Sequence, residues 1–468
     1  MSGPFGSTAW MSNPSTDFYG FPISNSLRFD AGSSNYLERD SYTHNRQIFT
    51  YSFWIKNTNP TVRQFIFGRY IDGSNVSALE YDSGGRLSWY DYQSSGYTFQ
   101  QRTTALFRDV SAWYHVVLRV DTTDGTAGNR ARMYVNGVEL TSFGASTTVS
   151  QNVSFLLGDG GNDFRWGTEG SNNRLHFGGY LADITVIDGT SYAPSAFAET
   201  KNDIWIPKDT AGLTFGNGGY RLQFKQTGTS QNSSGIGADT GGNDEHFSVS
   251  ALAAHDVVPD SPTNNFATLN SLSNDGHTLT EGNLHVSGNV VEGHQGSTFF
   301  VETGKWYFEG NLSTQQNDTA IGLVNSSASV PDNWTGETAN TVGYLSDGRF
   351  FENSSSDSYS SYGTSDIAQF AFDADTGEIW IGKNNTWQNS GDPAAGTGEV
   401  TTVSWADFSP AARTVGSGAM CFNFGQDGSF AGQKTAQGNA DGNGIGDFFY
   451  APPSGFLAIC TSNLPDPV

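Results

Sequence analysis

The chain has 468 residues, of which 13% are aromatic and only 15% are charged, and its formal net charge is −24. Because Lys and Arg form no cluster in this acidic chain, it is predicted to have no nucleic-acid partner held through phosphates and no affinity for an anionic membrane surface. No run of eighteen apolar residues occurs, so the sequence predicts no membrane partner of any kind. The 57 glycines, together with abundant Ser, Thr and Asn, favour short strands joined by turns, and the predicted fold class is all-β with two antiparallel β-sandwiches.

Residues 1–25 are rich in Gly, Pro, Ser and Phe and show no periodicity, so they are predicted to form an N-terminal arm, either a tether to a neighbouring subunit or a frayed terminus. The stretch lacks the basic region and apolar run of a secretory signal. Cys421 and Cys460 are the only cysteines, too few for a disulfide scaffold. These features predict a chain made in a cytoplasm but with the composition of an exported adhesin, which is what a virus particle requires.

Residues 26–228 are predicted to form the first sandwich. Apolar residues alternate with period two in residues 49–55, 113–120 and 181–187. Asn136-Gly137 separates two further runs of this kind, which predicts a tight hairpin. Strand patterns that follow one another without helical patterns between them indicate a sandwich rather than an alternating α/β sheet.

Four motifs in this region occur in the order and spacing of a known family. They are Ser26-Leu-Arg-Phe-Asp, Phe53-Trp-Ile, Trp113-Tyr-His115-Val-Val and Phe177-Gly-Gly-Tyr-Leu-Ala-Asp183-Ile-Thr-Val. The region resembles the laminin-G-like, concanavalin-like jelly roll. That resemblance implies two stacked antiparallel sheets and, in many members, calcium near the rim.

Residues 229–254 are dominated by Ser, Gly, Asn, Asp and Thr and are predicted to be a flexible linker. Strand patterns then restart, and residues 255–468 are predicted to form the second sandwich. Its motifs are Gly304-Lys-Trp-Tyr-Phe-Glu309, Phe370-Ala-Phe-Asp373, Lys383-Asn-Asn-Thr-Trp387 and Met420-Cys-Phe-Asn-Phe-Gly425. Their order resembles the SPRY family, which is another bent β-sandwich.

Residues 257–270 and 449–465 resemble segments of marine tailed-phage virion proteins. This resemblance implies a non-enzymatic structural protein in the virion, on a tail fibre or on the capsid surface, with other virion proteins as partners and a homo-oligomeric state. Host-surface glycan is a further candidate partner. The alternatives are a dedicated receptor-binding lectin for host adhesion and, with less support, a polysaccharide-degrading enzyme.

Carbohydrate binding requires aromatic faces beside polar hydrogen-bonding groups. The candidate residues with this mixture are Trp89, Tyr90, Asp91, Tyr92, Asp163, Trp166 and Trp334. The competing interpretation is that these aromatic side chains pack in the cores of the sandwiches.

A candidate calcium loop places oxygen side chains at alternate positions around glycines, in Asn439, Asp441, Asn443 and Asp447. The alternative is a Gly-rich turn held by hydrogen bonds from Asn and Asp side chains. The expected cofactor is therefore none, with calcium as the one candidate ion.

No catalytic residue is predicted. A jelly-roll glycosidase needs two carboxylates that project from one strand into a cleft. Glu80-Tyr-Asp82 is the nearest match, but Ser83-Gly-Gly follows at once and predicts a turn there. His115 falls in a predicted strand and is interpreted as a packing residue.

Overall fold

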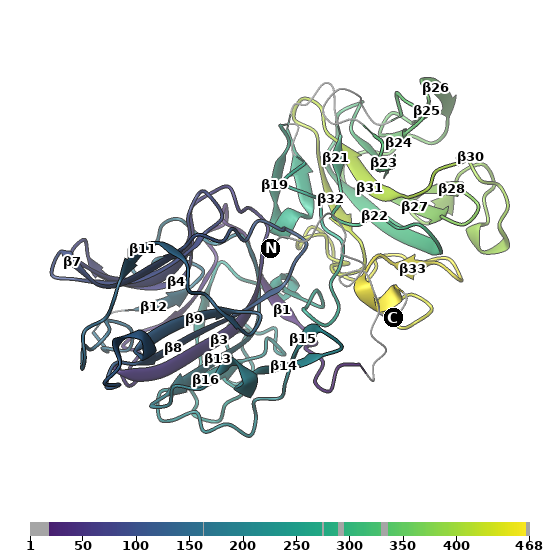
Figure 1. Cartoon of the computed structure of the whole chain (residues 1–468). Helices are drawn as coiled ribbons and strands as arrows, with labels where there is room; N and C mark the ends of the chain where they lie inside the picture. The colour runs from purple at the N-terminus through teal and green to yellow at the C-terminus, as the bar shows by residue number, and fades with distance from the viewer. Residues whose placement is uncertain (1–17, 162, 274–275, 289–293, 329–335, 465–468) are drawn as a thin grey trace. The chain divides into compact units, whose positions relative to one another are not determined.

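The computed structural model describes residues 18–161, 163–273, 276–288, 294–328 and 336–464. These residues form strands, turns and short 3-10 segments, with no α-helix among them (Figure 1). The described 3-10 segments are η2 (Ala127–Asn129), η3 (Pro194–Ala196), η4 (Ala254–Asp256), η5 (Glu281–Asn283), η6 (Pro393–Ala395) and η7 (Thr461–Asn463). The predicted all-β class is confirmed. The chain divides into two compact units, with the boundary along the chain between Asn264 and Asn265.

The first unit is built from two antiparallel sheets and a separate hairpin. In order of neighbours, the first sheet consists of β10 (Val138–Glu139), β9 (Ala131–Val135), β8 (Tyr114–Asp121), β3 (Ile48–Asn57), β13 (Gly179–Asp188), β1 (Ser26–Phe29) and β18 (Val257–Val258), with β16 (Tyr220–Leu222) also paired to β13. The second sheet consists of β11 (Phe143–Thr147), β7 (Gly96–Thr103), β6 (Leu87–Gln93), β5 (Asn75–Tyr81), β4 (Gln64–Asp72), β12 (Phe164–Trp166), β2 (Tyr36–Arg39) and β17 (Ser248–Ser250). The hairpin consists of β14 (Ala198–Lys201) and β15 (Ile204–Pro207).

The core of the first unit lies between the two sheets, as the alternation of apolar residues requires. Tyr51 and Phe53 of β3 face Phe67 and Trp166 of the opposite sheet, and all four side chains are fully buried. The hairpin between β9 and β10 turns at Asn136, whose φ is 48°, and the following glycine, whose φ is 77°. The predicted first sandwich is therefore present.

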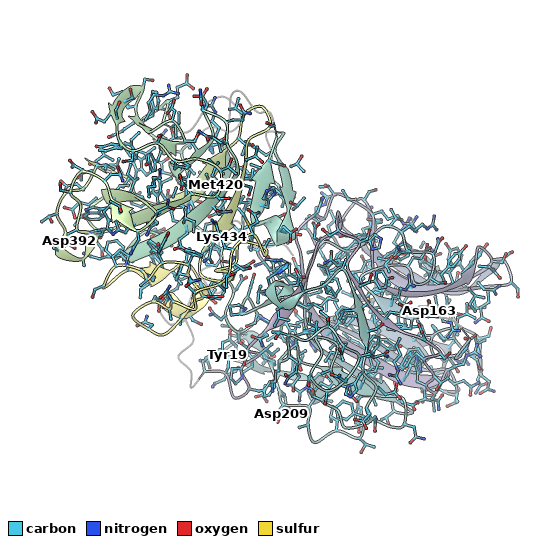
Figure 2. All side chains as sticks on the ribbon, turned by 180° about the vertical axis from the view of Figure 1, so that it is seen from behind. Tyr19, Asp163, Asp209, Asp392, Met420 and Lys434 are labelled. Carbon is cyan, nitrogen blue, oxygen red and sulfur yellow. The ribbon has the colours of Figure 1, made fainter. Side chains whose placement is uncertain are left out.

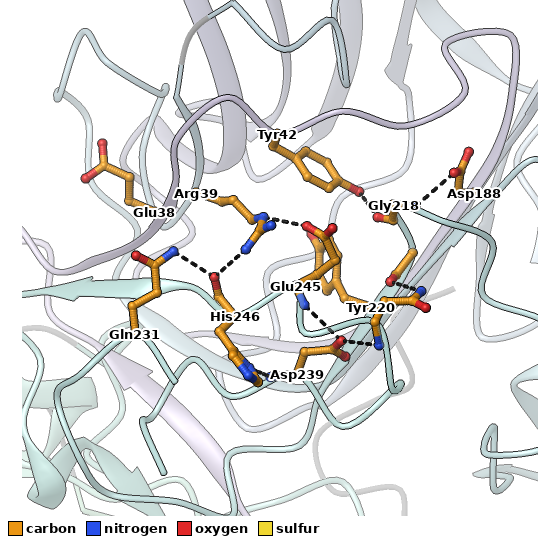
Figure 3. A network of polar contacts seen from close by, with 12 residues as sticks. Glu38, Arg39, Tyr42, Asp188, Gly218, Tyr220, Gln231, Asp239, Glu245 and His246 are labelled. Carbon is orange, nitrogen blue, oxygen red and sulfur yellow. Dashed lines mark hydrogen bonds and ion pairs between the residues drawn. The ribbon is translucent and has the colours of Figure 1, made fainter. Parts of the chain in front are cut away.

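Residues 229–254 are not a linker, and this prediction is wrong. Ile236 and Phe247 are fully buried in the core of the first unit, and β17 extends the second sheet by pairing with β2. Arg39 forms an ion pair of 2.5 Å with Glu245 and donates a hydrogen bond to the carbonyl of His246 (Figure 3). These buried apolar residues, together with Leu252 and a dense polar network, are enough to order a segment whose composition alone is typical of a flexible one.

The next residues also belong to the first unit, because β18 pairs with β1. Two buried ion pairs fix this stretch: Arg28 to Asp256 at 3.4 Å, and Lys56 to Asp260 at 2.8 Å. The boundary between the units therefore lies after Asn264 rather than at the predicted residue 254. Of the predicted N-terminal arm, residues 1–17 lie outside the described residues, while residues 18–25 pack on the first unit, for example through Ile23 and Thr263.

The second unit is also built from two sheets. In order of neighbours, the larger sheet consists of β19 (Thr278–Thr280), β20 (His285–Ser287), β32 (Ala419–Asn423), β22 (Lys305–Thr314), β27 (Ile367–Asp373), β28 (Glu378–Lys383) and β29 (Thr386–Trp387), with β30 (Thr401–Thr402) paired to β28 and β33 (Leu457–Ala458) paired to β22. The other sheet consists of β21 (Gln295–Gly296), β31 (Ser409–Arg413), β23 (Ala320–Val324), β24 (Thr341–Leu345), β25 (Arg349–Glu352) and β26 (Ser355–Ser358).

A buried carboxylate connects β22 to the segment near the end of the second unit. Glu309 is fully buried and accepts hydrogen bonds from the backbone amides of Phe449 and Tyr450, from the Tyr307 hydroxyl and from the Asn423 amide. Burial raises the pKa of Glu309 to about 7, although all four donors lower it. This side chain therefore holds residues 449 and 450 against the sheet without a cationic partner among the groups that shift its pKa.

Candidate functional site

A groove of about 550 Å³ lies on the outer face of the second sheet of the first unit, over β5, β6 and β7. Its size is in the range of small-ligand sites. The lining residues are Arg63, Val76, Glu80, Asp82, Ser83, Ser88, Tyr90, Tyr92, Tyr97, Gln100, Arg102, Glu169 and Arg174.

The alternation of side chains along β6 decides what faces this groove. Trp89 points inward and packs against Phe99 in the core, whereas Tyr90 and Tyr92 point outward into the groove. The outward side chains of β5, namely Val76, Ala78 and Glu80, complete the floor beside them, according to the strand register and the groove lining. Residues that are neighbours in the sequence of a strand therefore lie on opposite faces of the sheet.

The register places the groove residues in rows across three strands. Reading across β5, β6 and β7, the rows are Glu80, Ser88 and Arg102; then Ala78, Tyr90 and Gln100; then Val76, Tyr92 and Tyr97. Adjacent strands are about 4.8 Å apart, so each row spans on the order of 10 Å. One end of the groove is therefore aromatic and the other is charged.

Three tyrosines form the aromatic end. Tyr97 is 47% exposed, and its ring contacts Tyr92 at a centroid distance of 5.0 Å and Tyr90 at 5.9 Å, both edge to face. Tyr90 is buried beneath them. An exposed ring with a fixed orientation can pack against the C–H face of a sugar while its hydroxyl group hydrogen-bonds.

At the charged end, each glutamate is paired with an arginine. Arg63 donates from Nε and Nη2 to one oxygen of Glu80, at 3.0 and 2.7 Å. Arg174 donates from Nη2 to Glu169 at 3.0 Å and also from Nε. Both glutamates are buried and both arginines are about half exposed, so the arginine side chains are the parts a ligand can reach.

Burial raises the pKa of Glu80, and Arg63 only partly offsets this shift, while the nearby Glu169 adds to it. The hydrogen bond from Arg174 to Glu169 raises the pKa of the guanidinium of Arg174. The two glutamates therefore influence each other electrostatically within one groove.

Three of the predicted sugar-binding residues lie in the interior, and for them the prediction is wrong. Trp89, Asp91 and Trp166 are fully buried. The Trp166 indole N–H donates to the Tyr220 hydroxyl at 2.9 Å, and the Asp91 carboxylate accepts a hydrogen bond from the Leu156 amide at 2.8 Å. Because β6 and β12 are strands rather than loops, alternate residues point into the core.

Of the other predicted sugar-binding residues, Tyr90 and Tyr92 do line the groove. Asp163 lies just before β12 and outside the groove lining (Figure 2). Trp334 lies outside the described residues.

Asp163 belongs instead to an acidic cluster with Glu38 and Asp40, whose carboxylate oxygens lie within 4.8 Å of one another. Burial raises the pKa of Asp163, and the hydrogen bond and charge of Glu38 raise it further. Arg165 already supplies a positive charge there, at 2.6 Å from Glu38 and 3.3 Å from Asp163. This guanidinium occupies the place where a cation would compensate the cluster.

The four predicted calcium ligands take part in hydrogen bonds in and around one Gly-rich turn. Asp441 accepts hydrogen bonds from the amides of Asn443, Ile445 and Ala458, all at 2.9 Å. Asn439 donates to the carbonyls of residues 448 and 449, and Asp447 accepts from the amide of residue 438. The segment is a Gly-rich turn held by Asn and Asp hydrogen bonds, and calcium binding by it stays a prediction.

His115 is buried in the first unit, and burial lowers its pKa to about 3. The Trp205 indole N–H, which can only donate, bonds to Nδ1 at 3.0 Å, so Nε2 carries the proton and donates to the Ser52 hydroxyl at 2.8 Å. A histidine that donates to a serine does not activate it as a nucleophile. The pair is structural.

The sequence interpretation missed Arg63, Tyr97, Arg102, Glu169 and Arg174, which all line the groove. A signal for part of this set was present. Assigning β5, β6 and β7 as three consecutive strands would have placed Glu80, Tyr90 and Tyr92 on one face by period two. No local pattern marks Glu169 or Arg174, which come from the loop after β12.

Among the described residues, the structure contains no helix with the length and apolarity needed to span a bilayer.

Residues 30–195 match the family model of the concanavalin A-like lectin/glucanases superfamily. No curated protein matches the chain. This match covers the sheets that carry the groove and agrees with the resemblance seen in the sequence.

Several solved structures are similar to parts of the chain. The SPRY domain of human HERC1 is 16% identical, with 30% of this chain and 87% of that domain covered and a TM-score of 0.25. A putative carbohydrate-binding protein from Bacteroides ovatus is 17% identical, with 49% and 58% covered and a TM-score of 0.34. The heptameric SAP-like pentraxin from Limulus polyphemus is 16% identical, with 37% and 80% covered and a TM-score of 0.27. The family match therefore shows that residues 30–195 of the first unit are similar to the concanavalin A-like lectin/glucanases superfamily.

Proposed function

We propose that this protein is a non-enzymatic surface protein that binds glycan in the groove over β5–β7. The observation that carries the proposal is the cluster of Tyr90, Tyr92 and Tyr97 in a groove of about 550 Å³. The family model that matches residues 30–195 is named for lectins and glucanases, which supports a saccharide as the ligand.

Replacing Tyr97 by Ala should weaken glycan binding about tenfold, because the ring packs against a sugar face and its loss removes buried apolar area. The measurement is a glycan array followed by titration of the best ligand. Val138→Ala serves as the control, since Val138 is 66% exposed on β10 of the other sheet. Unchanged binding by Tyr97→Ala, with a ligand identified, would place the ligand elsewhere.

We further propose that the protein is a component of a tailed-phage virion, on a tail fibre or on the capsid surface, with other virion proteins and a second copy of itself as partners. The support is the sequence resemblance of residues 257–270 and 449–465 and the acidic, Gly- and Ser-rich composition. Antibody labelling of purified particles is expected to decorate one structure on the particle. Particles without label, from a lysate that contains the protein, would contradict the virion location.

Glycoside hydrolysis is a second candidate function, because Glu80 and Glu169 line the same groove and burial raises the pKa of Glu80. Against it, Nε and Nη2 of Arg63 both donate to one oxygen of Glu80, and Arg174 donates to Glu169. An arginine partner stabilises the ionised carboxylate, whereas a general acid has to carry a proton.

The purified protein is therefore expected to release no reducing ends from the glycan that it binds, at any pH between 5 and 8. Glu80→Gln is the diagnostic variant. Release of reducing ends by the natural chain that disappears in Glu80→Gln would establish catalysis and contradict the non-enzymatic proposal.

A further inference from the structure

Arg102 is the one lining residue of the groove that presents a whole guanidinium to solvent. It lies on β7, opposite Ser88 of β6, and is exposed. Among the residues that the structure describes, no hydrogen bond or ion pair involves its side chain. Its five N–H groups are therefore available to a ligand.

The acidic residues of the groove do not compensate this charge, because each already has a partner. Glu80 is bound by Arg63 and Glu169 by Arg174. Asp82 accepts hydrogen bonds from the amides of Gly84 at 2.8 Å and Arg86 at 3.0 Å, and the Arg86 side chain lies 3.4 Å from its second oxygen. Once these pairs are formed, the groove carries one net positive charge at Arg102.

The guanidinium groups of Arg63 and Arg174 also favour a ligand that accepts hydrogen bonds. Arg63 and Arg174 are 45% and 54% exposed, and each uses Nε and Nη2 on its glutamate. Within the described part of the chain, Nη1 of each is left for a ligand. The glutamate oxygens, by contrast, are buried, so the groove offers donors rather than acceptors at this end.

We infer that the ligand of this groove is an acidic saccharide, whose carboxylate or sulfate group is bound by Arg102 while its ring packs on the tyrosines. The inference rests on the proposed glycan-binding function. A planar guanidinium matches the two oxygens of a carboxylate and forms charge-assisted hydrogen bonds with it. The register places Arg102 and Tyr97 on the same strand and the same face, so one ligand can contact both.

The net charge of −24 does not oppose this binding at physiological salt. At 0.15 M ionic strength the Debye length is about 8 Å, so exposed charges elsewhere on the chain are largely screened at the groove. A contact made within hydrogen-bond distance is screened much less. The local charge at Arg102 therefore decides the preference.

The test compares an acidic probe, a galacturonate hexamer, with its uncharged, fully methyl-esterified form, by calorimetric titration of the full chain at 0.15 M salt. The natural chain should bind the acidic hexamer about tenfold more tightly than the ester. In Arg102→Gln this ratio should fall to about one. Arg119→Gln removes the same charge from β8 of the other sheet and is the matched control, in which the tenfold ratio should persist.

Three results would overturn the inference, and they separate it from the proposed function. A ratio near one in the natural chain, with both probes weakened by Tyr97→Ala, would exclude the acidic class and leave glycan binding standing. A tenfold ratio that survives in Arg102→Gln would show that another residue binds the acidic group. Binding of neither hexamer, and of no neutral glycan on an array, would overturn the proposed function together with the inference.

Discussion

Trp166→Ala should lower the free energy of unfolding of the first unit by about 4 kcal/mol, the range found when a buried Trp or Phe is truncated. Trp166 is fully buried, and its ring lies 4.8 Å from that of Phe67 and 5.2 Å from that of Phe53. The loss leaves a cavity between the sheets and removes the donor to the Tyr220 hydroxyl. The measurement is urea denaturation followed by circular dichroism.

Two variants separate the causes. Trp166→Phe retains most of the apolar volume and should recover more than half of the loss. Tyr97→Ala, which removes an exposed ring from the groove, should change stability by less than about 1 kcal/mol. If Trp166→Ala instead kept full stability and lost glycan binding, the indole would be a sugar platform and its place in the core would be wrong.

The second unit should lose stability as the pH rises from 5 to 8, because of Glu309. Burial raises its pKa to about 7 in the folded chain, from an ordinary value of 4.5. The protonated form is therefore favoured by folding. The contribution is complete below pH 4.5 and is lost as the pH rises through 7, and it amounts to about 3 kcal/mol.

Glu309→Gln cannot ionise, so it isolates this term. The stability of the variant minus that of the natural chain should rise by about 3 kcal/mol between pH 5 and pH 8. Taking this difference removes the contribution of other groups, which titrate alike in both chains. Glu302→Gln, at an exposed position of the same unit, is the matched control. A difference that falls with pH would mean that the four hydrogen-bond donors outweigh burial and hold the carboxylate ionised.

Much of the fold could be predicted because it depends on local alternation. The apolar residues of β3, β8 and β13 alternate in the sequence, and each of these strands was expected near its observed place. Asn136-Gly137 predicted a hairpin because few residue pairs adopt two successive positive φ values. The unit boundary was missed for the opposite reason, since Ile236, Phe247 and Leu252 are scattered, without strand or helix period, in a polar stretch.

The site was only half predictable. Tyr90 and Tyr92 were identified, but Trp89 was grouped with them because the segment was interpreted by composition instead of by strand period. Glu169 and Arg174 reach the groove from a loop whose path depends on tertiary packing. No single-strand pattern contains that information. The sequence pattern around Asp441 is equally uninformative, because its carboxylate accepts hydrogen bonds both from the turn, at Asn443, and from the distant backbone of Ala458.

The pairing of β18 with β1 has a consequence for how this module could pass between proteins. A recombination event that cut the gene at residue 228 or 254 would remove β18 and the acidic partners of Arg28 and Lys56. Arg28 and Lys56 would then lose these carboxylate partners, at a cost of about 3–5 kcal/mol each. The transferable module therefore ends at Asn264, and natural mosaics that share the first unit should carry their junctions there.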